Sequence, residues 1–128
     1  MTDTMALTAD IPQTVPETLT SHRPWGQFEQ FTLNEQTTVK VIAVDPGARL
    51  SKQRHEHRAE RWQVLDGPVD VEVDDRSWSA AQGEVVWVPQ GSVHRMGNSG
   101  AAQVRILEIG YGTFDEDDIE RLQDDYQR

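Results

Sequence analysis

The chain has 128 residues, which is enough for one domain built around a single core. Its 12 basic and 22 acidic residues give a formal net charge of −10, which disfavours nucleic acid and anionic membranes as partners. It contains no cysteine, so neither disulfides nor thiolate metal sites can form. No apolar run approaches the ~20 residues of a membrane-spanning helix, and the start lacks a basic-then-apolar signal, so we expect a cytoplasmic protein.

In chain order, residues 1–20 are rich in threonine, contain Pro12 and Pro16, and show little apolar periodicity. This composition predicts a flexible N-terminal arm, followed by one folded domain over residues 21–128. An arm that adds a strand to a partner subunit is the alternative interpretation of the same residues.

Apolar and polar residues then alternate in several short segments, as they do in half-buried strands. Turn signals separate these segments, which favours an antiparallel sandwich or barrel. The last stretch, residues 116–128, places Ile119, Leu122 and Tyr126 three or four residues apart and so predicts a short C-terminal α-helix. The predicted strands cover residues 28–33, 37–44, 60–65, 69–73, 84–89 and 102–112.

Two stretches carry side chains that bind metals. Gln53, His55 and His57 alternate in the first, so on a strand all three would point to one face, and Glu60 follows after a short polar break. In the second, His94 follows an apolar strand and a Pro-Gln-Gly turn. Imidazole, amide oxygen and carboxylate together suit a divalent metal. The alternative for each is an ordinary polar side chain on a half-exposed strand, and Gln53 and His57 compete for one place.

The spacing of these stretches resembles the paired motifs of the cupins. The first cupin motif runs from a glycine through two ligand positions to a glutamate and a second glycine. Here Gly47, Gln53, His55, Glu60 and Gly67 match it, with Gln53 in place of the first histidine. The literal pair His55 and His57 fits the spacing less well. The second motif matches at every position, in residues 83, 89, 91, 94 and 98.

A narrower resemblance is to the type II mannose-6-phosphate isomerase domain, usually the carboxyl-terminal part of a bifunctional mannose-1-phosphate guanylyltransferase. RPWG at residues 23–26, VPQGSVHRMGN at 88–98 and EDDIERLQDDYQR at 116–128 carry it, and it covers roughly residues 21 to 128. This chain has His55-Glu56-His57 where three histidines are usual, and Arg61 where a histidine is usual. The guanylyltransferase half is absent from the sequence, so nucleotide transfer is not expected of it.

The resemblance implies a cupin double-stranded β-helix, a jelly-roll barrel, with one divalent metal ion. Zinc is the first expectation, and manganese, iron, cobalt or nickel would also suit the donors. His57 is our candidate for the base that moves the proton, and Arg58 is the arginine that the family requires. Arg58, together with Lys52 or Arg95, would anchor the substrate phosphate. The implied metal ligands are Gln53, His55, Glu60 and His94.

The function implied is the interconversion of mannose-6-phosphate and fructose-6-phosphate. This reaction moves a proton between C1 and C2 of the sugar through an enediol, which a metal would favour by stabilising the developing negative charge. The alternatives are a non-catalytic cupin that binds a small sugar and a cupin dioxygenase. A small β-sandwich has free edge strands, and similar domains commonly pair, so we also expect a homodimer.

Overall fold

The structure is a computed structural model and describes residues 11–126. Strands and the loops between them account for this whole range, and it holds no helix that could cross a membrane. The strands are β1 (Leu19–Arg23), β2 (Gly26–Gln30), β3 (Thr37–Val44), β4 (Lys52–Arg54), β5 (Arg58–Val64), β6 (Val69–Val73), β7 (Arg76–Ala80), β8 (Val85–Val88), β9 (His94–Gly97), β10 (Val104–Gly112) and β11 (Glu120–Gln123).

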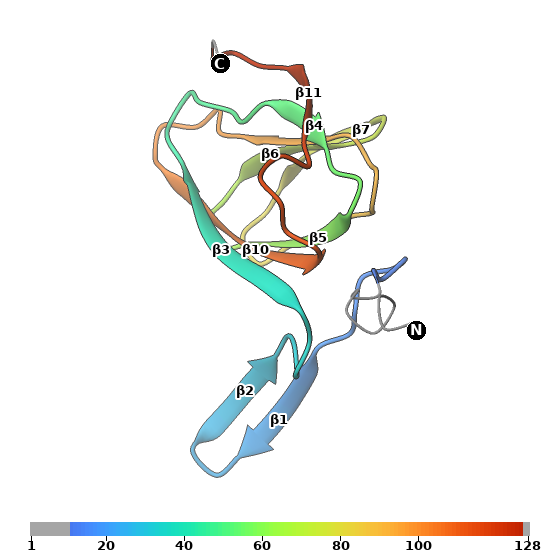
Figure 1. The fold of residues 1–128 in the computed structure, drawn as a ribbon. Helices are drawn as coiled ribbons and strands as arrows, with labels where there is room; N and C mark the ends of the chain where they lie inside the picture. Colours follow the sequence, from blue (N-terminus) through green and yellow to red (C-terminus); the bar gives the residue numbers. More distant parts are fainter. Residues whose placement is uncertain (1–10, 127–128) are drawn as a thin grey trace, which may run out of the picture.

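Two antiparallel sheets form the barrel (Figure 1). One has the order β3-β10-β5-β8 and the other the order β11-β4-β9-β6-β7. Strand β6 shows why the sequence folds this way: Val69, Val71 and Val73 are buried, whereas the residues between them are partly exposed. Burial of alternate side chains is what a sheet with one face on the core requires. The all-β architecture predicted from alternation is therefore confirmed.

The predicted C-terminal helix is wrong. Residues 120–123 instead form β11, which pairs antiparallel with β4. Strand β4 would otherwise leave one row of backbone groups without partners, and β11 supplies those hydrogen bonds. Arg54 and Glu120 add an ion pair of 2.7 Å between the two strands. Leu122 and Tyr126, two of the three residues of the expected apolar stripe, are exposed, and the Tyr126 hydroxyl donates to the carbonyl of Arg49 at 3.2 Å.

The N-terminal part forms a separate two-stranded sheet. Strands β1 and β2 pair with each other and extend away from the barrel (Figure 1). Leu19 and Thr20, placed in the arm by the sequence, are the first residues of β1, while residues 1–10 of the predicted arm lie outside the described residues. The division at residue 20 stays a prediction.

The sequence predicted a short polar break between His57 and Glu60, and the structure places the break earlier, at residues 55–57. Strand β4 ends at Arg54, residues 55–57 form a bend, and β5 begins at Arg58. The backbone N–H groups of Glu56 and His57 donate to the carboxylate of Asp118, each at 2.9 Å, which fixes the bend. The bend separates the directions of side chains that a straight strand would have aligned.

Candidate metal centre

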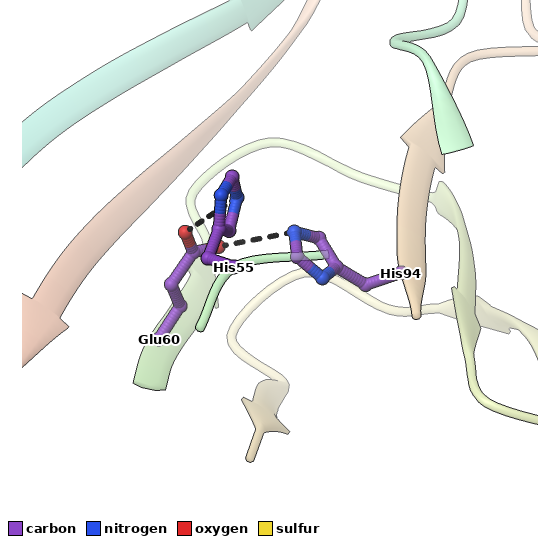
Figure 2. Close-up of side chains that lie close together, drawn as sticks. All are labelled: His55, Glu60 and His94. Atoms are coloured by element: carbon purple, nitrogen blue, oxygen red, sulfur yellow. Dashed lines mark ion pairs between the residues drawn. The ribbon is translucent and has the colours of Figure 1, made fainter. Parts of the chain in front are cut away.

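Three side chains from three segments meet inside the barrel. His55 lies just after β4, Glu60 lies in β5 and His94 begins β9, and Figure 2 shows all three pointing toward one another. The Nε2 atoms of His55 and His94 lie 3.5 and 3.7 Å from the two carboxylate oxygens of Glu60. Two ligands of one tetrahedral zinc ion lie roughly 3.3 Å apart, since each bond is about 2.0–2.1 Å long. The three groups, all mutually within 4.8 Å, fit one ion.

Both histidine rings are held in the tautomer that a metal needs. His55 Nδ1 lies 2.7 Å from the carbonyl oxygen of Asp118, and His94 Nδ1 lies 3.0 Å from that of Ser92. A carbonyl only accepts, so Nδ1 must carry the hydrogen and Nε2 keeps its lone pair. Burial lowers the pKa of His55, which favours the neutral ring. Histidine ligands in metal sites are usually oriented by this kind of bond.

Glu60 is an ionised carboxylate at neutral pH. Burial alone would raise its pKa, but the electrostatic influence of His94 and a hydrogen bond from Glu108 lower it to about 2. Trp62 Nε1 donates to Oε1 at 3.0 Å, and Arg58 Nε donates to Oε2 at 3.1 Å. These donors hold the carboxylate in place, with its oxygens facing the two histidines.

Gln53 lies beside this triad. It pairs with His94 across β4 and β9 and borders the same cavity. Its amide nitrogen donates to the hydroxyl and the carbonyl of Ser51, at 3.1 and 3.3 Å. Both bonds use the nitrogen, so they do not consume the amide oxygen that a metal would need.

His57 lies outside the cavity, so the expectation that it points inward is wrong. Its side chain is 70% exposed, and its Nδ1 lies 3.4 Å from a carboxylate oxygen of Asp118. The physical reason is the bend at residues 55–57, which ends the alternation after His55 and turns the next side chains outward. Of the two rivals for the fourth ligand position, only Gln53 borders the cavity.

Arg58 points into the barrel, and this orientation depends on the same bend. Because β5 starts at Arg58, this residue and Glu60 share one face of the strand. The Nη2 atom of Arg58 lies 3.1 Å from Nε2 of His55, so it would compete with a metal ion for the lone pair of that nitrogen. The guanidinium carbon of Arg58 lies 4.2 Å from the centre of the Phe114 ring. Nη1 is buried and has no hydrogen-bond partner within residues 11–126. A buried donor without a partner is costly, so a ligand oxygen would be favoured there.

The two other predicted anchors are arranged differently. Lys52 alternates with Gln53 on β4 and does not border the cavity. Arg95 borders it, but its guanidinium donates to the carbonyl of Leu50 at 2.9 Å and to Gln123 at 3.2 and 3.3 Å. Those bonds attach β11 to β9 and occupy one N–H of each of the three guanidinium nitrogens of Arg95.

Two cavity residues, Lys40 and Glu108, were missed by the sequence interpretation. Glu108 is buried on β10, where burial and the charge of Glu60 raise its pKa to about 8. Lys40 lies on β3 with its Nζ 4.0 Å from the centre of the Phe114 ring. The sequence contained a signal for both residues. Glu108 lies two positions from Ile106, and Lys40 lies two positions from Ile42, so on a strand each points to the same face as an apolar residue. A charged residue at an inward position of an apolar strand indicates a polar cavity.

The cavity itself is small, about 90 Å³. A water molecule occupies about 30 Å³ of the liquid, so a cation and one or two small groups fill it. A larger hollow of about 790 Å³ is bordered by β6, β7 and β9, but it contains none of the candidate triad.

Asp118 offers a test of how the bend supports the centre. We expect Asp118→Asn to weaken metal binding about 10- to 100-fold, since an NH2 donor replaces one of the two carboxylate oxygens that accept the N–H groups of the bend, and partners behind a ligand typically matter by that factor. Competition with a chromophoric chelator measures the affinity. The exposed neighbour provides the control, and Asp117→Asn should leave the affinity unchanged. An unaltered affinity in Asp118→Asn would contradict this role.

Comparison with known proteins agrees with the geometry. Residues 13–124 match the family described as mannose-6-phosphate isomerase C-terminal. The alginate biosynthesis protein AlgA of Pseudomonas aeruginosa is 43% identical over 108 residues, 84% of this chain and 22% of that protein. The mannose-1-phosphate guanylyltransferase ManC of Salmonella typhimurium is 35% identical over the same shares. The chain thus spans about a fifth of the length of these curated relatives.

Solved structures confirm the fold. A cupin-superfamily sugar phosphate isomerase from Silicibacter pomeroyi superposes with a TM-score of 0.56 at 20% identity, over 64% of this chain and 58% of that one. Oxalate oxidase superposes with a TM-score of 0.61 at 17% identity, over 67% and 46%. At such identities the likeness concerns architecture alone, and it is the cupin double-stranded β-helix. With the sequence match over residues 13–124, the chain belongs to the mannose-6-phosphate isomerase C-terminal family.

Proposed function

We propose that this chain is a metal-dependent isomerase that interconverts mannose-6-phosphate and fructose-6-phosphate. The observation that carries the proposal is the triad His55, Glu60 and His94, whose ligand atoms already converge within 4.8 Å. It lies in a chain whose family is described by the same enzyme activity. Relatives named for alginate and xanthan biosynthesis suggest a cytoplasmic supply of sugar phosphates for polysaccharide or GDP-mannose synthesis.

His55, Glu60 and His94 would hold one divalent cation, with the amide oxygen of Gln53 as a fourth donor. Zinc suits two imidazoles and a carboxylate, and manganese, iron, cobalt and nickel accept the same set. Such a cation supplies a Lewis acid that stabilises negative charge on a sugar oxygen during proton transfer. Trp62 and Arg58 keep Glu60 aimed at the centre throughout.

The proton between C1 and C2 needs a group inside the cavity, and we assign this role to Glu108 in place of His57. Glu108 is the only carboxylic side chain besides Glu60 among the residues that border the cavity. It approaches from β10, opposite the histidines' strands, so it can act on the sugar while the triad stays in place. Geometry is the first requirement of a general base, and His57 does not meet it.

Substrate anchoring falls to the cations that the cavity holds. Arg58 has a buried Nη1 without a partner in the described part of the chain, and Lys40 borders the same cavity with its Nζ 4.0 Å from the centre of the Phe114 ring that Arg58 also contacts. Both are better placed for a substrate oxygen than Lys52 or Arg95, because those two point elsewhere or are already bonded. A guanidinium is suited to oxygens of a phosphate or a sugar.

The test is an assay of the purified chain with mannose-6-phosphate, coupled to detection of fructose-6-phosphate. We expect turnover that chelation removes and that one equivalent of zinc, or another of the named metals, restores. Saturable sugar-phosphate binding without turnover, at full metal occupancy, would instead establish a non-catalytic sugar-binding cupin. Bound iron together with oxygen uptake would point to the dioxygenase.

A further inference from the structure

Lys40 and Glu108 carry opposite charges at directly opposite positions of two paired strands. Strand β3 pairs antiparallel with β10, and in their register Lys40 is the partner of Glu108. Both side chains border the metal cavity, so both lie on the inner face of the sheet. Opposite charges at such positions attract each other, since the Cβ atoms of directly opposite residues are only about 4.5–5.5 Å apart. The register alone therefore predicts an ion pair between Lys40 and Glu108.

The structure does not form this ion pair. None of the ion pairs within residues 11–126 joins Lys40 to Glu108. The ammonium nitrogen of Lys40 instead lies 4.0 Å from the centre of the Phe114 ring. The face of an aromatic ring carries partial negative charge and attracts a cation within about 6 Å. The ring of Phe114 therefore competes with Glu108 for the ammonium group.

Contacts that do not involve Lys40 place Phe114. The residue before it, Thr113, donates its backbone N–H to the carbonyl of His57 at 3.0 Å, which attaches the segment after β10 to the bend at residues 55–57. The guanidinium carbon of Arg58 lies 4.2 Å from the ring centre. Phe114 is not among the residues that border the cavity, so it can affect a ligand there only through its neighbours.

Of the two cations at this ring, Lys40 depends on it more. Arg58 is also held by the carboxylate of Glu60 at 3.1 Å and by the ring nitrogen of His55 at 3.1 Å, so its position would survive the loss of the ring. The ammonium group of Lys40 has neither a hydrogen bond nor an ion pair within residues 11–126, and its four-carbon stem is flexible. Without the ring, Glu108 on the neighbouring strand would capture it.

We propose that Phe114 is a positioning residue, which keeps the ammonium group of Lys40 away from Glu108 and available to an anionic oxygen of the substrate. Arg58 borders the same cavity, and its buried Nη1 has no partner in the described part of the chain. Together the two cations suit a phosphate or another oxyanion, because hydrogen bonds between charged groups are the strong ones. The effect of Phe114 on the reaction rests on the proposed isomerase function, whereas its effect on anion binding does not.

Titration calorimetry of the zinc-loaded full chain with inorganic phosphate tests the proposal without requiring turnover. We expect Phe114→Leu to bind phosphate about 10-fold more weakly than the wild type, because leucine fills a similar space but offers no negative face. Phe114→Tyr keeps the aromatic face and should restore the wild-type affinity to within about twofold. Metal content and circular dichroism verify that each variant is folded.

Phe31→Leu is the matched control. The guanidinium carbon of Arg61 lies 4.8 Å from the centre of the Phe31 ring, but Arg61 does not border the cavity. The same exchange of phenylalanine for leucine beside a cation should therefore leave phosphate affinity unchanged at this position. A wild type that binds no phosphate, or equal affinities in the wild type and Phe114→Leu, overturns the proposal.

A double-mutant cycle with Lys40→Met shows whether the ring acts through Lys40. In the Lys40→Met background we expect Phe114→Leu to change phosphate affinity by less than about twofold, since the cation that the ring positions is already gone. A merely structural role of Phe114 predicts the same loss in both backgrounds, and that result would contradict the assigned role.

The isomerase assay separates this inference from the proposed function. We expect Phe114→Leu to raise KM for mannose-6-phosphate about 10-fold, as the loss of a binding interaction does. If the chain has no turnover but the phosphate affinities follow the expected pattern, the isomerase function alone is wrong. If the wild type turns over and Phe114→Leu matches it in both KM and phosphate affinity, the role of Phe114 alone is wrong.

Discussion

Replacing His94 by alanine is expected to remove the bound metal and to lower kcat/KM at least about 10³-fold, since Lewis-acid stabilisation of the reacting oxygen supplies several kcal/mol. His55, Glu60 and the weaker amide oxygen of Gln53 would remain, and the loss of one of the two imidazoles leaves an incomplete site. Elemental analysis after dialysis gives the metal content, and the coupled assay gives the rate. His94 was chosen over Glu60 because removing Glu60 would also leave Arg58 buried without its carboxylate.

The sequence suggested His57 as the catalytic base, whereas the structure places its side chain outside the cavity. His57→Ala tests which of the two is right. Its imidazole is exposed, so His57→Ala should retain the metal and keep kcat/KM within a few-fold of the wild type. His22→Ala, on the hairpin, controls for the loss of any surface histidine. If His57→Ala lost as much activity as His94→Ala, the bend would have to open in solution and bring His57 to the substrate.

The successful part of the sequence prediction came from spacing between fixed turns. The resemblance to the two cupin motifs predicted His55, Glu60 and His94 as ligands, and the structure brings these three side chains within 4.8 Å of one another. The prediction of side-chain direction from alternating residues failed for a residue that does not lie on a strand. His57 was assigned inward on a period of two, but β4 ends at Arg54.

The C-terminal segment shows a second limit of local pattern. Ile119, Leu122 and Tyr126 have helical spacing, yet a helix of this length gains little stability unless its apolar face is buried. The free edge of β4 decides the outcome instead, and no local pattern reveals that a distant strand needs a partner. The same reasoning explains why Glu108 was missed: its role depends on lying next to Glu60, and the pairing of β10 with β5 that brings them together joins segments far apart in the sequence.

Glu108→Gln is the second change with a large expected effect. We expect kcat to fall about 10²- to 10⁴-fold, the usual contribution of a positioned general acid–base, with little change in KM. Glutamine keeps the size of the side chain and removes its ability to exchange a proton. Incorporation of solvent deuterium into the sugar should fall with kcat, because both require the same proton transfer. Glu108→Asp keeps the carboxyl group and should recover part of the activity.

Glu108 contacts a metal ligand, so its variant must be separated from an effect on the metal itself. If Glu108 only oriented Glu60, Glu108→Gln would weaken metal binding and added metal would restore the rate. If Glu108 moves the proton, metal affinity stays near the wild-type value and excess metal restores nothing. Glu72→Gln, the same change on the outward face of β6, should leave both quantities unchanged. If Glu108→Gln kept wild-type turnover, Glu108 would not be the base. Lys40, which borders the same cavity and is not a candidate metal ligand, would then be the next residue to test.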